Sequence, residues 1–217
     1  MKLRNLIFLL LLYALPLTLY PLPVYAQDIG QAKIHPASPV YFLKSFKEIL
    51  ELKVSKPDQK GLKYFEFAQR RIREVNSLIS ENRADLIPPA LEKYSLYMEK
   101  VLGHLDFKNA NLARRVLEYV KGHIISLDRV FGQTQNQRAK IAIRAAIFRL
   151  FEWHQSLPER LSVETKLSIL PQIQEDERLI CDFLSKEASS SALNDTEKAV
   201  LIERVQKCFQ NLGSGRF

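Results

Sequence analysis

Apolar residues recur every three or four positions along most of the chain, which is the pattern of helices that bury one face. No segment shows the alternation of apolar and polar residues that is typical of strands. The sequence therefore predicts an all-α fold, a bundle of about seven antiparallel helices joined by short loops. Their expected bounds are 38–54, 58–80, 85–105, 109–132, 134–157, 162–186 and 194–212, with Asn109 or Asn111 at the start of the fourth helix.

The first predicted helix has a strong start, because Ser38 can accept hydrogen bonds from the first turn and Pro39 tolerates the first helical position. An apolar stripe follows and is expected to face the core: Phe42, Leu43, Phe46, Ile49 and Leu50. Aromatic residues are expected to join the first two helices in the core: Tyr41, Phe42, Phe46, Tyr64, Phe65 and Phe67. Phe67 lies off the main stripe, so it could anchor a partner, but packing against a third helix is favoured.

Further boundaries come from single residues. Thr134 is expected to begin the fifth helix, and Pro171 predicts a kink or break in the sixth. Asn194 and Glu197 have the spacing of a capping box at the start of the seventh.

Residues 1–26 have the pattern of a secretory signal. Lys2 and Arg4 precede an apolar run, and small residues before Gln27 fit cleavage after Ala26. The alternative is an uncleaved membrane anchor, although three prolines interrupt the apolar run. We therefore expect an exported, extracytoplasmic protein, either in the cell envelope or secreted.

The stretch from residue 36 to 78 contains an ordered motif, which Tyr94 in a third helix continues. Its residues are Pro36, Ser38, Pro39, Tyr41, Phe42, Leu43, Lys44, Pro57, Asp58, Ala68, Arg71, Ile72 and Glu74. This motif resembles that of a bacterial exported helical family known only as domain of unknown function 5667. The resemblance covers about residues 36–105 and implies no known activity and no catalytic residues. It does imply a preceding signal or membrane segment and, in some members, attachment to anti-sigma-factor-like proteins.

The expected organisation is a signal peptide (1–26), a polar lead-in (27–37), a three-helix family-like domain (38–106), a four-helix region (107–212) and a tail (213–217). The connection between the two helical regions is too short for a linker. One continuous body is therefore favoured over two domains.

Cys181 and Cys208 are the only cysteines, and an exported protein can pair them. Their unequal distances from the expected turn argue against a disulfide, unless the sixth helix continues through the serines that follow it. Both alternatives, a disulfide and two small buried side chains, stay open.

Chemistry-bearing motifs are scarce. None of the four histidines lies four residues from another histidine or a cysteine, and no phosphate-binding loop or nucleophile motif occurs. The acidic run Glu175–Glu177 lacks the pattern of a calcium loop and is expected to be a solvated face. We therefore predict no catalytic, cofactor or metal site, and no enzyme.

Residues 108–150 contain nine basic and two acidic residues, within a chain whose formal charge is +8. Such a segment could bind an anionic membrane surface or envelope polymer, or it could be a solvated face. The residues predicted to bind an anionic partner are Arg114, Arg115, Lys121, Arg138, Lys140 and Arg144. Nucleic acid is not expected, because export removes the protein from it.

Together these features predict an exported, non-enzymatic helical module that binds a partner in the cell envelope, either an anionic surface or another protein. The alternative is an extracytoplasmic stress or signalling accessory, which rests on the family resemblance.

Overall fold

The computed structural model describes residues 29–190 and 193–214. These residues form α-helices and short 3-10 turns without any strand, so the all-α prediction is confirmed for this part of the chain. The α-helices are α2 (Tyr41–Val54), α3 (Lys60–Ser80), α4 (Ile87–His104), α5 (Ala110–Gln133), α6 (Gln137–Ser156), α7 (Val163–Ala188) and α8 (Asp195–Ser214). The 3-10 turns are Pro57–Gln59, Ala84–Leu86 and Pro158–Arg160. The predicted signal segment lies outside the described residues, and none of the described helices is long and apolar enough to cross a bilayer.

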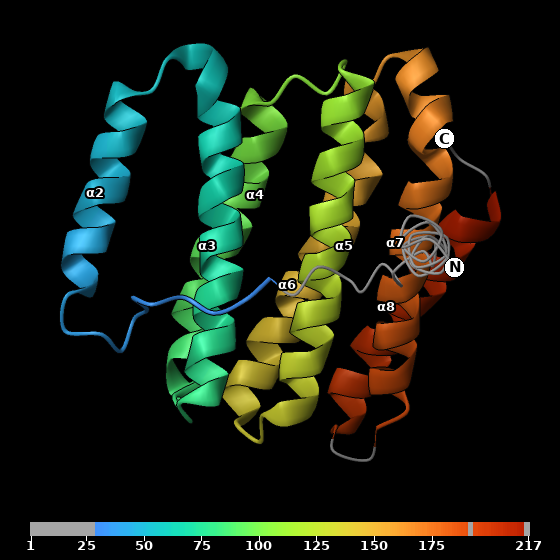
Figure 1. Cartoon of the computed structure of the whole chain (residues 1–217). Helices are drawn as coiled ribbons and strands as arrows, with labels where there is room; N and C mark the ends of the chain where they lie inside the picture. The colour runs from blue at the N-terminus through green and yellow to red at the C-terminus, as the bar shows by residue number, and fades with distance from the viewer. Residues whose placement is uncertain (1–28, 191–192, 215–217) are drawn as a thin grey trace, which may run out of the picture.

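Consecutive helices alternate in direction and form two layers (Figure 1). α3, α5 and α7 make the layer nearer the viewer, and α4, α6 and α8 lie behind it. α2 stands at the edge of the first layer and packs against α3. Among the described residues, no helix lies against the other side of α2.

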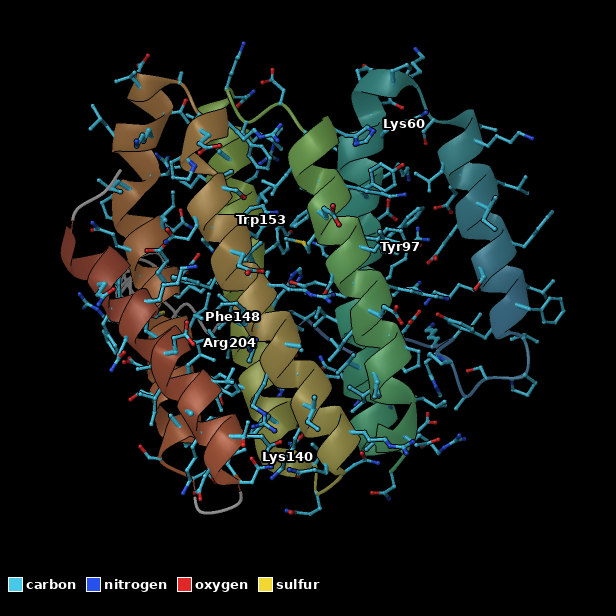
Figure 2. The ribbon with its side chains drawn as sticks, turned by 180° about the vertical axis from the view of Figure 1, so that it is seen from behind. Lys60, Tyr97, Lys140, Phe148, Trp153 and Arg204 are labelled. Atoms are coloured by element: carbon cyan, nitrogen blue, oxygen red, sulfur yellow. A yellow bond between two sulfur atoms is a disulfide. The ribbon has the colours of Figure 1, made fainter. Side chains whose placement is uncertain are left out.

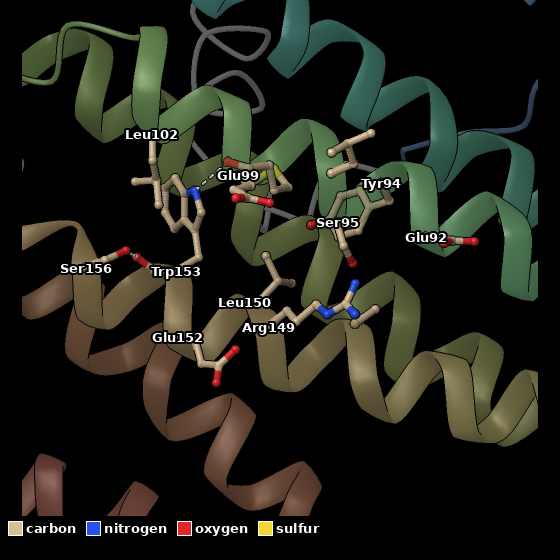
Figure 3. A pocket seen from close by; sticks show the side chains of 13 residues that line it. Glu92, Tyr94, Ser95, Glu99, Leu102, Arg149, Leu150, Glu152, Trp153 and Ser156 are labelled. Carbon is tan, nitrogen blue, oxygen red and sulfur yellow. Dashed lines mark hydrogen bonds between the residues drawn. The ribbon is translucent and has the colours of Figure 1, made fainter.

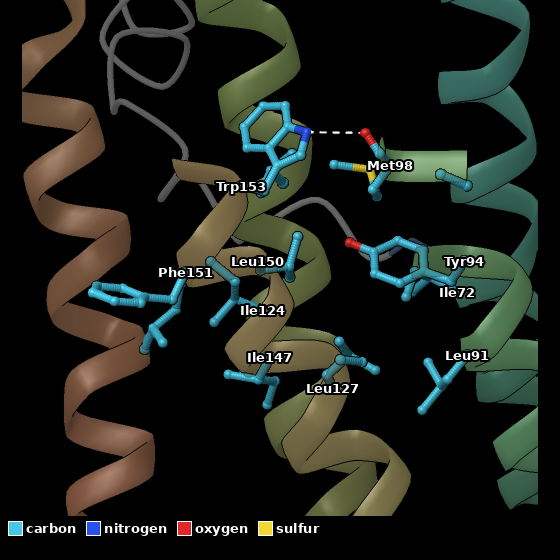
Figure 4. Close-up of a cluster of buried hydrophobic side chains, with 14 of the residues drawn as sticks. Ile72, Leu91, Tyr94, Met98, Ile124, Leu127, Ile147, Leu150, Phe151 and Trp153 are labelled. Atoms are coloured by element: carbon cyan, nitrogen blue, oxygen red, sulfur yellow. Dashed lines mark hydrogen bonds between the residues drawn. The ribbon is translucent and has the colours of Figure 1, made fainter. Parts of the chain in front are cut away.

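The core fills the space between the layers (Figure 4). The indole Nε1 of Trp153 donates a hydrogen bond to the carbonyl oxygen of Met98 at 3.1 Å, which ties α6 to α4. A second buried hydrogen bond joins the Tyr94 hydroxyl to Nδ1 of His123 at 3.1 Å. Burial lowers the pKa of His123 to about 3, so its ring is neutral.

Several helix starts follow the predictions, because capping depends on neighbours in sequence. Asn109 and Ser162 accept hydrogen bonds from backbone N–H groups three residues later, at 3.1 and 3.2 Å. Asn194 and Glu197 form the predicted capping box. Thr134 was the wrong choice, since it ends α5 and α6 is capped by Asn136.

Two other local predictions differ from the structure: the helix start at Ser38 is wrong, and of the kink or break at Pro171 the break is wrong. Ser38 does not cap a helix, because its hydroxyl accepts the backbone N–H of His35 in a tight turn, and α2 begins only at Tyr41. Pro171 does not break α7, which continues from Val163 to Ala188. Pro171 lies on the exposed side of the helix, where water can reach the carbonyl that loses its donor.

Candidate functional site

Helix α2 turns its polar side towards the protein, contrary to the sequence prediction. Phe42 is 68% exposed and Phe46 60%, and Ile49 and Leu50 are also exposed. The buried residue of α2 is instead a carboxylate, Glu48. The predicted core stripe of the first helix is therefore a solvent-facing surface. Two other aromatic residues, Phe65 and Phe67, are buried as predicted. Phe67 packs on Tyr97 of α4, so the favoured prediction that it contacts a third helix is confirmed.

Charged and hydroxyl groups hold α2 to α3. We call this set the α2–α3 ion network: Tyr41, Lys44, Glu48, Arg71 and Glu74. The Arg71 guanidinium donates to the Tyr41 hydroxyl at 2.6 Å and to Glu48 at 2.5 Å, and lies 3.0 Å from Glu74. Lys44 donates to Glu74 at 2.5 Å, and the Tyr41 hydroxyl donates to the other oxygen of Glu74 at 3.2 Å.

Burial shapes the electrostatics of this network. It raises the pKa of Glu74 above its ordinary value, although the charges of Arg71 and Lys44 act in the opposite direction. It also raises the pKa of Tyr41, with the carboxylate of Glu74 adding to the effect. Tyr41 is therefore a neutral hydroxyl that accepts from Arg71 and donates to Glu74. Tyr97, labelled in Figure 2, lies within 6.0 Å of the Arg71 guanidinium and adds an aromatic wall from α4.

Four of the five network residues belong to the set that carries the family resemblance: Tyr41, Lys44, Arg71 and Glu74. The fifth, Glu48, lies one helical turn after Lys44. The sequence therefore contained a signal for the polar side of α2, namely Tyr41, Lys44, Glu48 and Glu51 at helical spacing. It was missed because the apolar stripe was taken as the buried one.

The exposed side chains of α2 are apolar or basic. We call this surface the outer face of α2: Phe42, Leu43, Phe46, Lys47, Ile49, Leu50, Lys53 and Val54. The two acidic residues of α2, Glu48 and Glu51, point inward to Arg70. The outer face thus combines six apolar side chains with two positive charges and no negative one.

A cleft of about 490 Å³ adjoins the outer face, between residues 31–34, α2 and α3. Its charged lining residues are all basic: Lys33, Lys44, Lys47, Arg70 and Arg73. We call it the basic cleft. Leu43 and Lys47 belong both to this cleft and to the outer face of α2, so the two surfaces are continuous.

The six residues predicted to bind an anionic partner are not brought together on one surface. Arg114 and Arg115 are exposed near the start of α5, whereas Arg138 and Lys140 follow its other end, about 30 Å away along the helix axis. Lys121 pairs with Glu175 at 2.6 Å.

Two members of the predicted set, Lys140 and Arg144, interact with neighbours within the protein. Lys140, labelled in Figure 2, lies 5.2 Å from the centre of the Phe131 ring. Arg144 is buried, and its charge acts on Glu187. The residues of the predicted basic site are therefore dispersed along α5 and the first half of α6.

The predicted solvated face at Glu175–Glu177 is wrong for two of its three residues. Asp176 and Glu177 are fully buried between α6 and α7. Asp176 lies 3.3 Å from His154, and Gln155 donates to Glu177 at 2.7 Å. Burial raises the pKa of both carboxyl groups. These residues connect two helices and have no access to a solvent-borne substrate.

Cys181 and Cys208 form a disulfide that joins α7 to α8, with 5.7 Å between their Cα atoms. Cys181 lies about 10 Å from the end of α7 and Cys208 about 20 Å from the start of α8. The six residues between the helices are long enough to span the difference. The pair was left open from sequence because that loop was treated as a tight turn.

A second concave surface lies between α4 and α6 (Figure 3). Its volume is about 600 Å³, and Leu150 and Trp153 line it. Three carboxylates surround it, from Glu92, Glu99 and Glu152, with one guanidinium from Arg149. This groove is acidic and therefore unsuited to an anionic partner. Among the described residues, no group of three or more side chains has the composition of a metal site.

Residues 33–137 match the family described as a domain of unknown function (DUF5667). The match includes α2, the ion network, all of α5 and the first residue of α6, so it extends beyond the predicted range of 36–105. No curated protein and no solved structure matches the chain. The predicted resemblance is confirmed, because residues 33–137 of this chain match the DUF5667 family.

Proposed function

We propose that this protein is an exported, non-enzymatic binding module of the bacterial cell envelope, and that α2 docks it on an anionic membrane surface. The observation that carries the proposal is the outer face of α2. A helix whose exposed side is apolar, with lysines and no acid, has the composition of helices that lie in the membrane interface.

The length of α2 fits a helix that lies on a membrane surface. Its 14 residues make a helix of about 21 Å, which is too short to span a bilayer but sufficient to lie on one.

The ion network lets α2 act as a docking element without loss of the fold. Because Arg71, Glu48 and Glu74 attach the polar side of α2 to α3, its apolar side is free for lipid. No residue of the core needs to leave its place when the outer face enters a membrane.

Export is supported by two features. The leader pattern of residues 1–26 predicts it, and the disulfide between Cys181 and Cys208 suits an oxidising compartment. Sequencing the N-terminus of the protein from a bacterial envelope fraction tests this directly. Gln27 at the N-terminus would support cleavage. Met1 at the N-terminus would instead indicate that residues 1–26 are retained as a membrane anchor.

Membrane docking is tested by co-sedimentation of the mature chain, Gln27–Phe217, with phosphatidylcholine vesicles that contain or lack phosphatidylglycerol. Phe46→Ser should weaken binding to the anionic vesicles about tenfold, because a side chain that is 60% exposed loses about 1.5 kcal/mol of burial in the interface. Leu167→Ser on α7, where the side chain is 69% exposed, is the matched control and should leave binding unchanged.

The same assay distinguishes α2 from the basic residues of α5. If Phe46→Ser binds like the wild type while reversal of Arg114 and Arg115 to Glu abolishes binding, the docking surface lies on α5 and the assignment to α2 is wrong. High salt should weaken binding in either case, since exposed charges are screened.

A further inference from the structure

We propose that the basic cleft binds the phosphate group of an anionic phospholipid. This inference rests on the proposed docking of α2 and names the headgroup that the docked protein would recognise. The cleft provides five positive side chains and no negative one in its lining, next to an exposed apolar surface.

The walls of the basic cleft are held by hydrogen bonds. The backbone N–H of Ala32 donates to the hydroxyl of Ser77 at 2.8 Å, and Ser77 donates back to the carbonyl of Ala32 at 3.1 Å. Asn76 donates to the carbonyl of Gly30 at 3.0 Å, and Lys44 donates to that of Ile34 at 2.9 Å. The segment is thus fixed along α3 before any ligand arrives, which reduces the entropy lost on binding.

The cations of the cleft differ in how far they are already neutralised. Lys44 and Arg70 form close ion pairs with carboxylates of the α2–α3 interface. Lys47 makes only a 3.7 Å contact to Glu51 and is 74% exposed. Lys33 and Arg73 form no ion pair with any described residue. An incoming anion therefore meets three cations with little or no compensation.

Phosphate suits this arrangement because a guanidinium can donate two parallel hydrogen bonds to it while ammonium groups add point charges. The neighbouring apolar residues select a lipid over a free phosphate. Leu43 lines the cleft and belongs to the outer face of α2, and Ile34 at its wall is 37% exposed. A headgroup in the cleft would thus place its acyl chains along the outer face.

The test compares two anionic vesicles of equal surface charge, one with phosphatidylglycerol and one with oleate, both in the neutral, phosphate-free lipid digalactosyldiacylglycerol. The mature wild-type chain should prefer the phosphatidylglycerol vesicles by about tenfold, as expected for a few charge-assisted hydrogen bonds. The double variant Lys33→Gln/Arg73→Gln should lose that preference. Arg149→Gln/Lys207→Gln removes the same two charges elsewhere and should keep it.

Two checks keep the comparison interpretable. Fluorescence of Trp153, the single tryptophan, shows whether each variant retains the native core. Lys33→Gln alone, at an exposed side chain, repeats the comparison if the double variant fails to fold.

Each remaining outcome decides between the two proposals. Equal binding of the wild type to both vesicles would overturn phosphate recognition and leave the docking of α2 intact. No binding to either vesicle would overturn the docking and, with it, the lipid assignment. In calorimetry, soluble glycerol phosphate that binds the wild type but not the double variant, without vesicle binding, would assign the cleft to a free phosphate instead.

Discussion

Replacing Arg71 with Met should detach α2 from α3 while the rest of the fold persists. Arg71 is 1% exposed and contacts Tyr41, Glu48 and Glu74. Met has a similar length but no charge, so the substitution removes the central cation and leaves two buried carboxylates. In the variant, Glu74 would still form its ion pair with Lys44, whereas the ion pair left to Glu48 would be the 3.4 Å contact with Arg70.

Removal of one partner from a buried ion pair costs about 3–5 kcal/mol, because the remaining charge stays buried without compensation. The apolar side chains of α2 face outward, so they cannot offset that loss by burial. A loss of about 3 kcal/mol increases the open population of α2 by about 100-fold. The network residues belong to α2 and α3, and none belongs to α5.

Hydrogen exchange followed by mass spectrometry measures both effects in one sample. Amides of Tyr41–Val54 should exchange about 100-fold faster in Arg71→Met, while those in the middle of α5 keep wild-type rates. Lys63→Met removes the exposed ion pair with Glu66 and is the control, with an expected cost below about 1 kcal/mol. Unchanged exchange in α2, or equal acceleration in α5, would refute the argument that the network holds α2 alone.

Three further predictions concern the stability of the fold. Gly61→Ala should destabilise the protein by about 1–3 kcal/mol in thermal unfolding, because the added Cβ would lie 2.7 Å from the backbone of His104; an unchanged Tm would contradict this close approach. The folded pKa of His123 is about 3, below its ordinary value of 6.5, so between these pH values the unfolded chain binds more protons. Stability should fall by up to about 1.4 kcal/mol per pH unit as the pH decreases through that window, and urea unfolding of His123→Asn should show a shallower dependence. Reduction of the disulfide between Cys181 and Cys208, 27 residues apart, should lower the free energy of unfolding by about 3 kcal/mol, and equal urea midpoints in the oxidised and reduced forms would argue against this.

Predictions that depended on neighbours in sequence were mostly right. The caps at Asn109, Ser162 and Asn194 need only a side chain and the backbone of the same turn. Ser38 does not cap a helix because its hydroxyl accepts the backbone N–H of His35 in a turn. Thr134 was chosen wrongly because a second capping residue, Asn136, stands two positions later and caps α6. Helix bounds therefore followed from local chemistry to within a few residues.

The orientation of α2 could not be derived in this way. Its sequence carries an apolar stripe and a polar stripe on opposite sides, and either could face the protein. The surface of α3 decides the matter, because Arg70, Arg71 and Glu74 need charged partners when they are covered. For a helix with one apolar and one polar stripe, the neighbouring helix decides which stripe is buried. The candidate site on the outer face of α2 could therefore be recognised only once the surface of α3 was known.

Local sequence determined that the described residues are helical, where most of their helices begin and end, and which family residues 33–137 match. The tertiary structure decided which stripe of α2 is buried, that the basic residues of α5 and α6 are dispersed along these helices, and that Cys181 meets Cys208. The physical reason is the same in each case. Hydrogen bonds within a turn are set by residues a few positions apart, whereas burial and charge pairing depend on side chains that only the packing of helices brings together.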